Sequence, residues 1–179
     1  MKHFIAVDLG TNTSAVAVYG PHGPEVIKVD GAELVPSAVM IVPNPDAKSD
    51  ADPKWIAVVG QKAVRAREKS PRSPYFFSSF KRYLGAVHNP EERTDEQMVP
   101  SPDGMLHYQG PDGFTYAPED LASYILELLK AAAEEKLSAD IDSLILCVPT
   151  TYNIAQRNVL RKAAQLAGFE DIEIGRAHV

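Results

Sequence analysis

The stretch VDLGTNTSAVAVYG, Val7–Gly20, decides the fold around which the chain is built. An apolar strand enters a turn of Asp, Leu, Gly, Thr, Asn, Thr and Ser, and a second apolar strand follows at once. A plain hairpin needs only a two-residue turn, so the polar residues 8–14 need a further explanation. Backbone N–H groups that converge in a tight turn form an anion-binding concavity. The stretch therefore predicts two antiparallel strands joined by a candidate anion site.

The polar groups of this turn suit a magnesium nucleotide. Gly10 lets a ligand approach the backbone closely, and Thr11, Asn12 and Thr13 offer hydroxyl and amide donors. Asp8 would repel a phosphate unless a cation lay between them, and Mg²⁺ held through water resolves that conflict. The alternative is a polar hairpin whose Asp and Asn side chains close Asx turns. The seven residues alone leave both interpretations open.

Composition narrows the class of protein. The chain has 179 residues, a net charge of −6 and one cysteine, Cys147. The acidic charge argues against nucleic acid as the main partner, and no apolar run is long enough to cross a bilayer. The N-terminus lacks the shape of a signal peptide, and a lone cysteine fits a reducing compartment. We expect a cytoplasmic protein with no nucleic-acid or membrane partner.

The order of predicted elements indicates an α/β fold. Three strands come first, then a proline-rich region from Leu34 to about Ala117, and then a helix, a strand and a helix. The apolar run SLILCV predicts a buried central strand, and Asn153 with Gln156 forms a capping-box pattern. The expected elements outside the proline-rich region are strands at His3–Asp8, Thr13–Tyr19, Glu25–Val29, Ser143–Val148 and Asp171–Ile174, with helices starting at Pro118 and Asn153. This order suggests a ribonuclease H-like half of the actin-like ATPase fold, with a mixed five-stranded sheet.

The proline-rich region could be an inserted lobe. It predicts strands at Ser37–Val42 and Trp55–Val59, helical stretches near Gln61–Lys69 and Ser78–Leu84, and a hairpin at Met105–Tyr116. Its stretch SSFKRYLG, Ser78–Gly85, sets Lys81 among apolar neighbours, which would hold the lysine in one position. The alternative is a solvated basic helix, part of a wider basic stretch made of Lys62, Arg65, Arg67, Lys69, Arg72, Lys81 and Arg82.

Several stretches together resemble the 70-kilodalton heat-shock chaperones, the DnaK-like ATPases. The nucleotide domain of that family opens with a strand ending in Asp-Leu-Gly-Thr-Thr-Asn-Ser, and this chain has Asp-Leu-Gly-Thr-Asn-Thr-Ser. The other similar stretches are VPSAV (35–39), VVGQKA (58–63), FKRYLG (80–85), APEDLASYIL (117–126), VPTTYNIAQR (148–157) and KAAQLAGFE (162–170). The chain departs from the family by transposing Asn12 and Thr13 and by placing Ile154 where the family has Asp.

The resemblance implies a role for individual residues. Asp8 would bind Mg²⁺ through water, and Lys81 would lie near the γ-phosphate of ATP and stabilise charge as water attacks it. Pro149 and Arg157 would belong to the relay that reports the nucleotide state, ATP or ADP, to a peptide-binding domain. The β- and γ-phosphates would be held by Gly10, Thr11 and the backbone N–H groups of Asn12 and Thr13.

The resemblance also implies a division of the chain and a set of partners. Residues 1–37 and 117–174 would form the ribonuclease H-like subdomain, and residues 38–116 the smaller inserted one. Unfolded polypeptide clients would bind a C-terminal domain outside this chain, with a J-domain co-chaperone and a nucleotide exchange factor as further partners. The second phosphate loop and the adenosine pocket of the family also lie beyond these residues, so we expect the 179 residues alone to be inactive.

Other interpretations remain open from sequence. A sugar kinase or an actin-like filament protein would share the fold, and a decayed nucleotide lobe could serve only as an interaction module. Ile174–Val179 matches what one frame of a common sequencing adapter encodes, so we expect residues 175–179 to be a non-native tail. We interpret Cys147 as a buried, inert thiol. The histidines show no ligand spacing, so no zinc site is expected, and the residues considered are His3, His22, His88 and His107.

Overall fold

Alternating side chains in the first two strands set one face of a central sheet against the core. The computed structural model describes residues 4–87, 89 and 95–176. Strand β1 spans Phe4–Leu9 and strand β2 spans Thr13–Gly20. Because successive side chains of a strand point to opposite faces, the buried face carries Val7 and Val16, each at most 1% exposed. Asp8 lies on the opposite face and is exposed.

The central sheet is mixed, as expected, and adds the short strand β4 to the five expected strands. Its strands run β12-β11-β1-β2-β3, with the two-residue β4 added on β2. β1, β11 and β12 are parallel, and β2 pairs antiparallel with β1 and β3. The bounds are β3 Gly23–Val26, β4 Val35–Pro36, β11 Ser143–Val148 and β12 Asp171–Arg176. The predicted bounds of the third strand, Glu25–Val29, were wrong, because β3 begins two residues earlier and ends at Val26.

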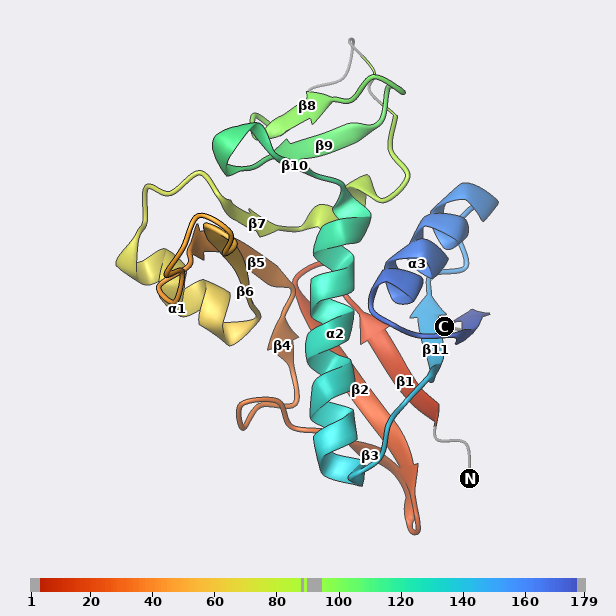
Figure 1. Ribbon diagram of the computed structural model, residues 1–179. Helices are drawn as coiled ribbons and strands as arrows, with labels where there is room; N and C mark the ends of the chain where they lie inside the picture. The colour runs from red at the N-terminus through yellow and green to blue at the C-terminus, as the bar shows by residue number, and fades with distance from the viewer. Residues whose placement is uncertain (1–3, 88, 90–94, 177–179) are drawn as a thin grey trace.

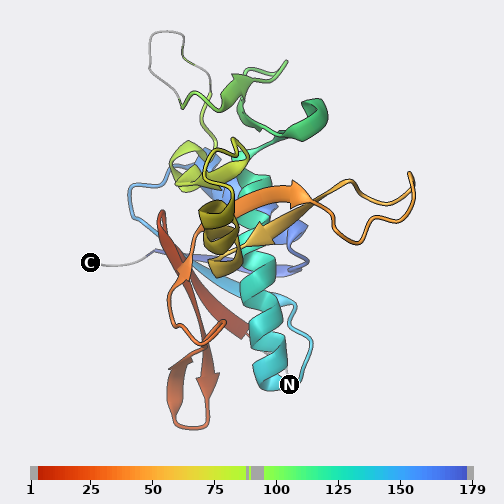
Figure 2. The same ribbon diagram turned by 90° about the vertical axis from the view of Figure 1, so that its left-hand side faces the viewer.

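Two helices cover the same face of this sheet (Figures 1 and 2). Helix α2, Pro118–Leu137, begins with the expected proline, and the carboxylate of Asp120 accepts a 2.8 Å hydrogen bond from the N–H of Ala117. Helix α3 spans Ile154–Leu166. Leucine, isoleucine and alanine side chains of α2 are buried against the sheet, namely Leu121, Ala122, Ile125, Leu126, Leu129 and Ala133. α2 returns the chain to the sheet so that β11 can run parallel to β1.

The region between β4 and α2 forms two small antiparallel sheets, ordered β6-β5-β7 and β10-β9-β8. One short helix, α1 at Gln61–Lys69, has the predicted bounds. The prediction of a helix at Ser78–Leu84 was wrong in type, because this stretch holds the end of a strand and one 3₁₀ turn, η1 at Phe80–Tyr83. The remaining bounds are β5 Ala38–Pro43, β6 Trp55–Val59, β7 Phe76–Ser78, β8 Met98–Pro100, β9 Leu106–Gln109, η2 Pro111–Gly113 and β10 Thr115–Tyr116.

One hydrophobic core joins the inserted segment to the central sheet. Phe77 and Phe80 of the insert are at most 1% exposed and belong to the same apolar cluster as Leu121 of α2 and Val7 of β1. Figure 1 shows the β8–β10 sheet beyond one end of α2, and the β5–β7 sheet beside it. The division into residues 1–37 with 117–174 and residues 38–116 stays a prediction.

The second face of the central sheet carries no helix among the described residues. Ala15, Ala17 and Cys147 are only half-buried on it. The expectation of a buried thiol was therefore wrong, because Cys147 pairs in register with Asp8 and shares its open face. β12 continues through Gly175 to Arg176, so part of the supposed tail is paired with β11.

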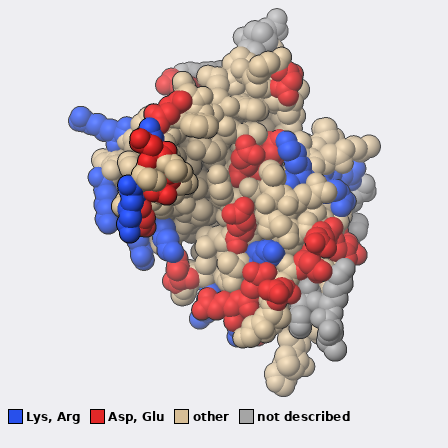
Figure 3. All heavy atoms as spheres, in the orientation of Figure 1, with Lys and Arg blue, Asp and Glu red and all other residues tan. Residues whose placement is uncertain are grey.

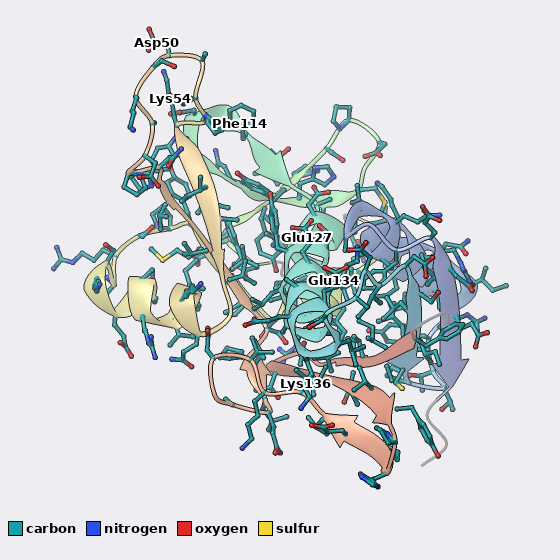
Figure 4. The ribbon with its side chains drawn as sticks, turned by 60° about the horizontal axis from the view of Figure 1, so that its bottom comes forward. Asp50, Lys54, Phe114, Glu127, Glu134 and Lys136 are labelled. Atoms are coloured by element: carbon teal, nitrogen blue, oxygen red, sulfur yellow. The ribbon has the colours of Figure 1, made fainter. Side chains whose placement is uncertain are left out.

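Charged side chains tie the helix ends to their neighbours. Lys136 at the end of α2 forms a 2.7 Å ion pair with Glu25 of β3. Figure 4 shows Lys136 beside the hairpin formed by β2 and β3. Lys162 of α3 donates to the buried carboxylate of Glu119 at 3.1 Å. Figure 3 shows Lys and Arg gathered at the edge over α1, with acidic side chains down the middle of the face. Among the described residues, no helix has the length and apolar character that crossing a membrane requires.

Among the described residues, one buried side-chain oxygen or nitrogen atom lacks a hydrogen-bond partner. The hydroxyl of Tyr108 is fully buried and makes no hydrogen bond there. Its ring packs against Phe77 and Tyr83, with ring centroids 5.2 Å and 6.3 Å away. Burial, with a smaller contribution from the Asp95 carboxylate, raises the pKa of Tyr108 above its ordinary value. The hydroxyl thus lowers stability while the ring raises it.

Replacing Tyr108 by Phe should stabilise the protein. The change Tyr108→Phe removes an unsatisfied buried hydroxyl, which costs about 1–3 kcal/mol, and keeps the ring. Urea unfolding at pH 7 should show a gain in this range, whereas Tyr19→Phe, at a side chain 83% exposed, should change nothing. An equal or lower free energy of unfolding for Tyr108→Phe would contradict the assignment.

The same hydroxyl should also contribute to alkaline unfolding. Above a pH of about 10, where an unperturbed tyrosine ionises, the unfolded chain releases the Tyr108 proton before the folded chain does. The unfolded state then binds fewer protons, so stability falls as pH rises. Tyr108→Phe should therefore move the midpoint of alkaline unfolding, followed by circular dichroism, to higher pH.

Candidate functional site

The turn between β1 and β2 has a shape that requires glycine at position 10. A Cβ atom on Gly10 would lie 2.0 Å from the carbonyl oxygen of Thr13, closer than real Cβ atoms approach any heavy atom. The turn thus folds back on itself between the paired residues Leu9 and Ser14. This close approach makes residues 10–13 one small bend at the end of the sheet. That the backbone N–H groups of this bend bind an anion stays a prediction.

Two buried hydroxyls hold this turn from behind. Ser37 donates a 2.9 Å hydrogen bond through its Oγ to the carbonyl oxygen of Gly10, and its backbone N–H donates to the carbonyl of Asn12 at 2.8 Å. A hydroxyl has one proton, so Ser14, whose Oγ lies 2.8 Å from that of Ser37, is the donor in their bond. Ser14 is 1% and Ser37 2% exposed. The hydrogen-bonded chain Ser14–Ser37–Gly10 fixes the bend from the protein interior.

The outer side of the turn keeps its polar groups available. Within the described residues, the side chains of Asp8, Thr11, Asn12 and Thr13 make no hydrogen bond or ion pair. Asp8, Asn12 and Thr13 are exposed, and Gly10 and Thr11 are half-exposed. No group of three or more His, Cys, Asp and Glu side chains gathers around a metal position in the described part of the chain, and His3 and His88 lie outside it. The turn therefore offers one carboxylate with several hydroxyl and amide groups beside it.

Buried apolar neighbours fix the backbone that carries Lys81. Lys81 lies in η1 between Phe80 and Leu84, each 1% exposed. Ser79 enters the turn with φ 58° and Gly85 leaves it with φ 71°, so left-handed backbone bounds it on both sides. A Cβ on Gly85 would come within 3.8 Å of the backbone of Gln156, so the end of η1 approaches the first turn of α3.

The surroundings of the ammonium are an aromatic ring and a more distant carboxylate. The Nζ of Lys81 lies 5.6 Å from the centroid of the Tyr152 ring, within the range of a cation–π interaction. Partial burial lowers the pKa of Lys81, and the negative charge of Asp8 opposes that shift. Asp8 therefore acts on the lysine electrostatically, although no ion pair within 4.0 Å joins them among the described residues. The two side chains are therefore near enough to interact through their charges.

The segment from Pro149 to Arg157 continues the same region. The N–H of Tyr152 donates to the carbonyl of Pro149 at 3.1 Å, which closes a turn after β11. Asn153 and Gln156 then exchange side-chain hydrogen bonds of 2.8 and 3.1 Å, which confirms the predicted capping box. Arg157 is half-buried, and in the described residues its guanidinium makes no hydrogen bond or ion pair. Tyr152, rather than Pro149 or Arg157, meets the lysine.

Sequence reasoning found most of this constellation and missed its supports. It singled out Asp8, the turn residues 10–13 and Lys81, and the structure brings these to one end of the central sheet. It did not single out Ser14, Ser37 or Tyr152 for the site. Ser37 is 23 residues away from Ser14, and no spacing rule links two serines across a strand and a long loop. For Tyr152, the sequence did offer one signal, because an aromatic residue stands directly before the cap of a helix.

The fold and the candidate site together define the structural class of the protein. A mixed sheet with three parallel strands on one side, an antiparallel hairpin on the other and inserted small sheets is the ribonuclease H-like half-domain of the actin-like ATPase fold. Its first turn combines a strand-end carboxylate, close-packed backbone and a facing lysine. The Hsp70 protein family matches residues 4–174, and the chain belongs to this family.

A curated relative agrees with the family assignment. The chaperone protein DnaK of Akkermansia muciniphila is 30% identical to this chain over 178 residues. The aligned region covers 95% of this chain and 26% of that DnaK. The chain therefore spans about a quarter of the length of the relative it matches.

Removing the Ser37 hydroxyl should loosen the turn. Ser37→Ala leaves both the Ser14 hydroxyl and the Gly10 carbonyl without their buried partner, so a loss of about 1–3 kcal/mol in the free energy of unfolding is expected. Ser14→Ala should cost less, because Ser37 keeps its acceptor. The double variant should cost less than the sum of the two single variants.

Urea unfolding measures these losses, and amide hydrogen exchange of residues 10–13 locates them. Ser49→Ala, in an exposed loop where Ser49 bonds only Asp52 and its own neighbours, serves as the control. Additive losses for the two serines, or unchanged exchange in the turn of the Ser37 variant, would show that the hydroxyl chain does not hold the bend.

Proposed function

We propose that this chain forms one wall of the ATP site of a DnaK-like chaperone, which couples ATP binding and hydrolysis to the binding and release of unfolded polypeptide. The observation that carries the proposal is the arrangement of Lys81 opposite the β1–β2 turn, with Asp8 acting on its charge. A positioned cation facing a bend of backbone N–H groups suits a polyphosphate held between them. Membership of the Hsp70 family supports the same reading.

The donor set fits a magnesium nucleotide. Asp8, exposed at the end of β1, would hold Mg²⁺ through water, as that ion prefers. Gly10, Thr11, Asn12 and Thr13 would hold the β- and γ-phosphates of ATP and the β-phosphate of ADP. Mg²⁺, when bound, neutralises charge on the phosphate oxygens. With Asn12 and Thr13 transposed, the backbone N–H contacts to phosphate would be kept, whereas the side-chain bonds of the family loop would change.

Lys81 would stabilise charge near the γ-phosphate while water attacks it. The lysine is suited to this role because its ammonium is already partly desolvated and held in place before ligand binds. A preorganised cation needs no rearrangement when negative charge develops. Pro149 and Arg157 would carry the nucleotide state onward, since they lie on the turn and helix start that contact the lysine through Tyr152.

The other parts of such a chaperone would come from sequence outside these residues. The chain spans about a quarter of the DnaK it matches, so the second wall of the nucleotide site and the client-binding domain would come from further sequence. Residues 1–37 with 117–174 would form one subdomain, and residues 38–116 the inserted one. Client polypeptides, a J-domain co-chaperone and a nucleotide exchange factor would be its partners in the cytoplasm.

Replacing Lys81 by Ala in the full-length protein should slow ATP hydrolysis. Loss of one preorganised charge-stabilising group lowers turnover by about 10²–10³-fold, and single-turnover hydrolysis measures the step directly. Arg82→Ala, at the exposed neighbour in the same 3₁₀ turn, is the matched control and should stay near the wild-type rate. Turnover of Lys81→Ala within a few-fold of wild type would remove the lysine from the mechanism.

The 179 residues alone should not bind ATP tightly. One wall supplies phosphate contacts but no adenosine pocket, so isothermal calorimetry with Mg-ATP should show no micromolar affinity. The full-length protein under the same conditions should bind. Micromolar binding by the isolated chain would contradict the two-wall site.

A further inference from the structure

We propose that Tyr152 is a positioning residue for Lys81: the face of its ring holds the ammonium in front of the β1–β2 turn. The inference rests on the proposed function, in which Lys81 acts on the γ-phosphate. It adds a residue that lies on neither the phosphate turn nor the inserted segment. The contact that carries it is the 5.6 Å separation between Nζ and the centroid of the ring.

The backbone around Tyr152 is fixed on both sides. Its own N–H closes the turn begun by Pro149, with a 3.1 Å bond to that carbonyl. The next residue, Asn153, is the cap of α3 and exchanges two side-chain hydrogen bonds with Gln156. The ring is half-buried. An unperturbed tyrosine ionises only near a pH of about 10, and burial raises the pKa of Tyr152 further, so the ring is neutral at physiological pH. A neutral ring on a fixed backbone presents a constant face to a cation.

The lysine is fixed at its base but not at its tip. Phe80 and Leu84 bury the two sides of the 3₁₀ turn and settle the position of the Lys81 backbone. The side chain still has four rotatable bonds, from Cα–Cβ to Cδ–Cε. Among the described residues, no carboxylate lies within 4.0 Å of the ammonium, and Asp8 acts from further away. The Tyr152 ring is therefore the contact that selects where the ammonium lies.

The segment that carries Lys81 packs against the helix that follows Tyr152. The backbone of Gly85, at the end of the lysine turn, lies close to Gln156 and Val159 of α3, with 3.5–3.8 Å between these atoms and a Cβ placed on the glycine. The start of α3 and the lysine turn thus touch directly. A shift of the segment between Pro149 and Arg157 would carry the Tyr152 ring with it. The ring is the point at which such a shift would reach the ammonium.

Two substitutions of Tyr152 in the full-length protein separate the ring from its hydroxyl. Tyr152→Phe keeps the aromatic face, and Tyr152→Leu keeps apolar volume without it. Single-turnover hydrolysis should stay within about two-fold of wild type for Phe and fall about ten-fold for Leu, in the range that cation–π interactions support. The Kd for ATP should stay unchanged in both, because Tyr152 contacts the lysine and not the phosphate turn.

A spectroscopic readout tests the contact without activity. Protons on the Lys81 Cε of ¹³C-lysine-labelled protein, assigned with Lys81→Arg, should be shifted upfield by the nearby ring. The shift should persist in Tyr152→Phe and vanish in Tyr152→Leu. If Tyr152→Leu does not fold, Tyr152→Met supplies the same comparison.

Each outcome decides the inference. Loss of rate and of the ring shift in the Leu variant, with both kept in the Phe variant, supports it. A Phe variant as slow as the Leu variant, or a Leu variant as fast as wild type, overturns it, as does an unshifted Lys81 signal in the wild type. If Lys81→Ala hydrolyses ATP normally, the proposed function fails separately, and the ring shift then shows only a structural contact.

Discussion

The burial of Phe80 and Leu84 on either side of a lysine is the constraint on which the site depends. A single 3₁₀ turn cannot hold a long, flexible side chain by its own hydrogen bonds. The two apolar residues enter the same core as the central sheet and α2, so the turn cannot move without opening that core. Lys81 is thereby carried from the inserted segment to the end of β1. The location of the charge follows from apolar packing rather than from ion pairing.

The turn that faces this lysine is held by a second, polar constraint. Ser37 lies between β4, which belongs to the central sheet, and β5, which belongs to the insert. Its hydroxyl and its N–H both bind the β1–β2 turn. One residue therefore connects the bend with the point where the insert begins, so the β1–β2 turn and the segment that carries Lys81 depend on the same junction.

The sequence predicted the central sheet, α1, α2 and the cap of α3 because their signals are local: alternation in β1 and β2, Pro118, and the Asn153–Gln156 pair. It misplaced β3, where Pro24 and an exposed edge weaken the alternation of apolar and polar residues. It predicted a helix at η1 because the sequence of a single turn does not distinguish a 3₁₀ turn from an α-helix. It also missed the short strands β4, β7 and β8. The supports of the site depend on contacts between distant segments, such as Ser14 with Ser37 and Lys81 with Tyr152, which periodicity does not encode.

The central claim is that the β1–β2 turn and Lys81 face the same nucleotide phosphates. An acyl phosphate of ATP transfers its acyl group to a lysine amine beside the terminal phosphate, and peptide mapping by mass spectrometry then identifies that lysine. In the full-length protein, we expect acylation of Lys81 that excess Mg-ATP suppresses. Acylation of Lys62 or Lys162 with no acylation of Lys81 would contradict the claim.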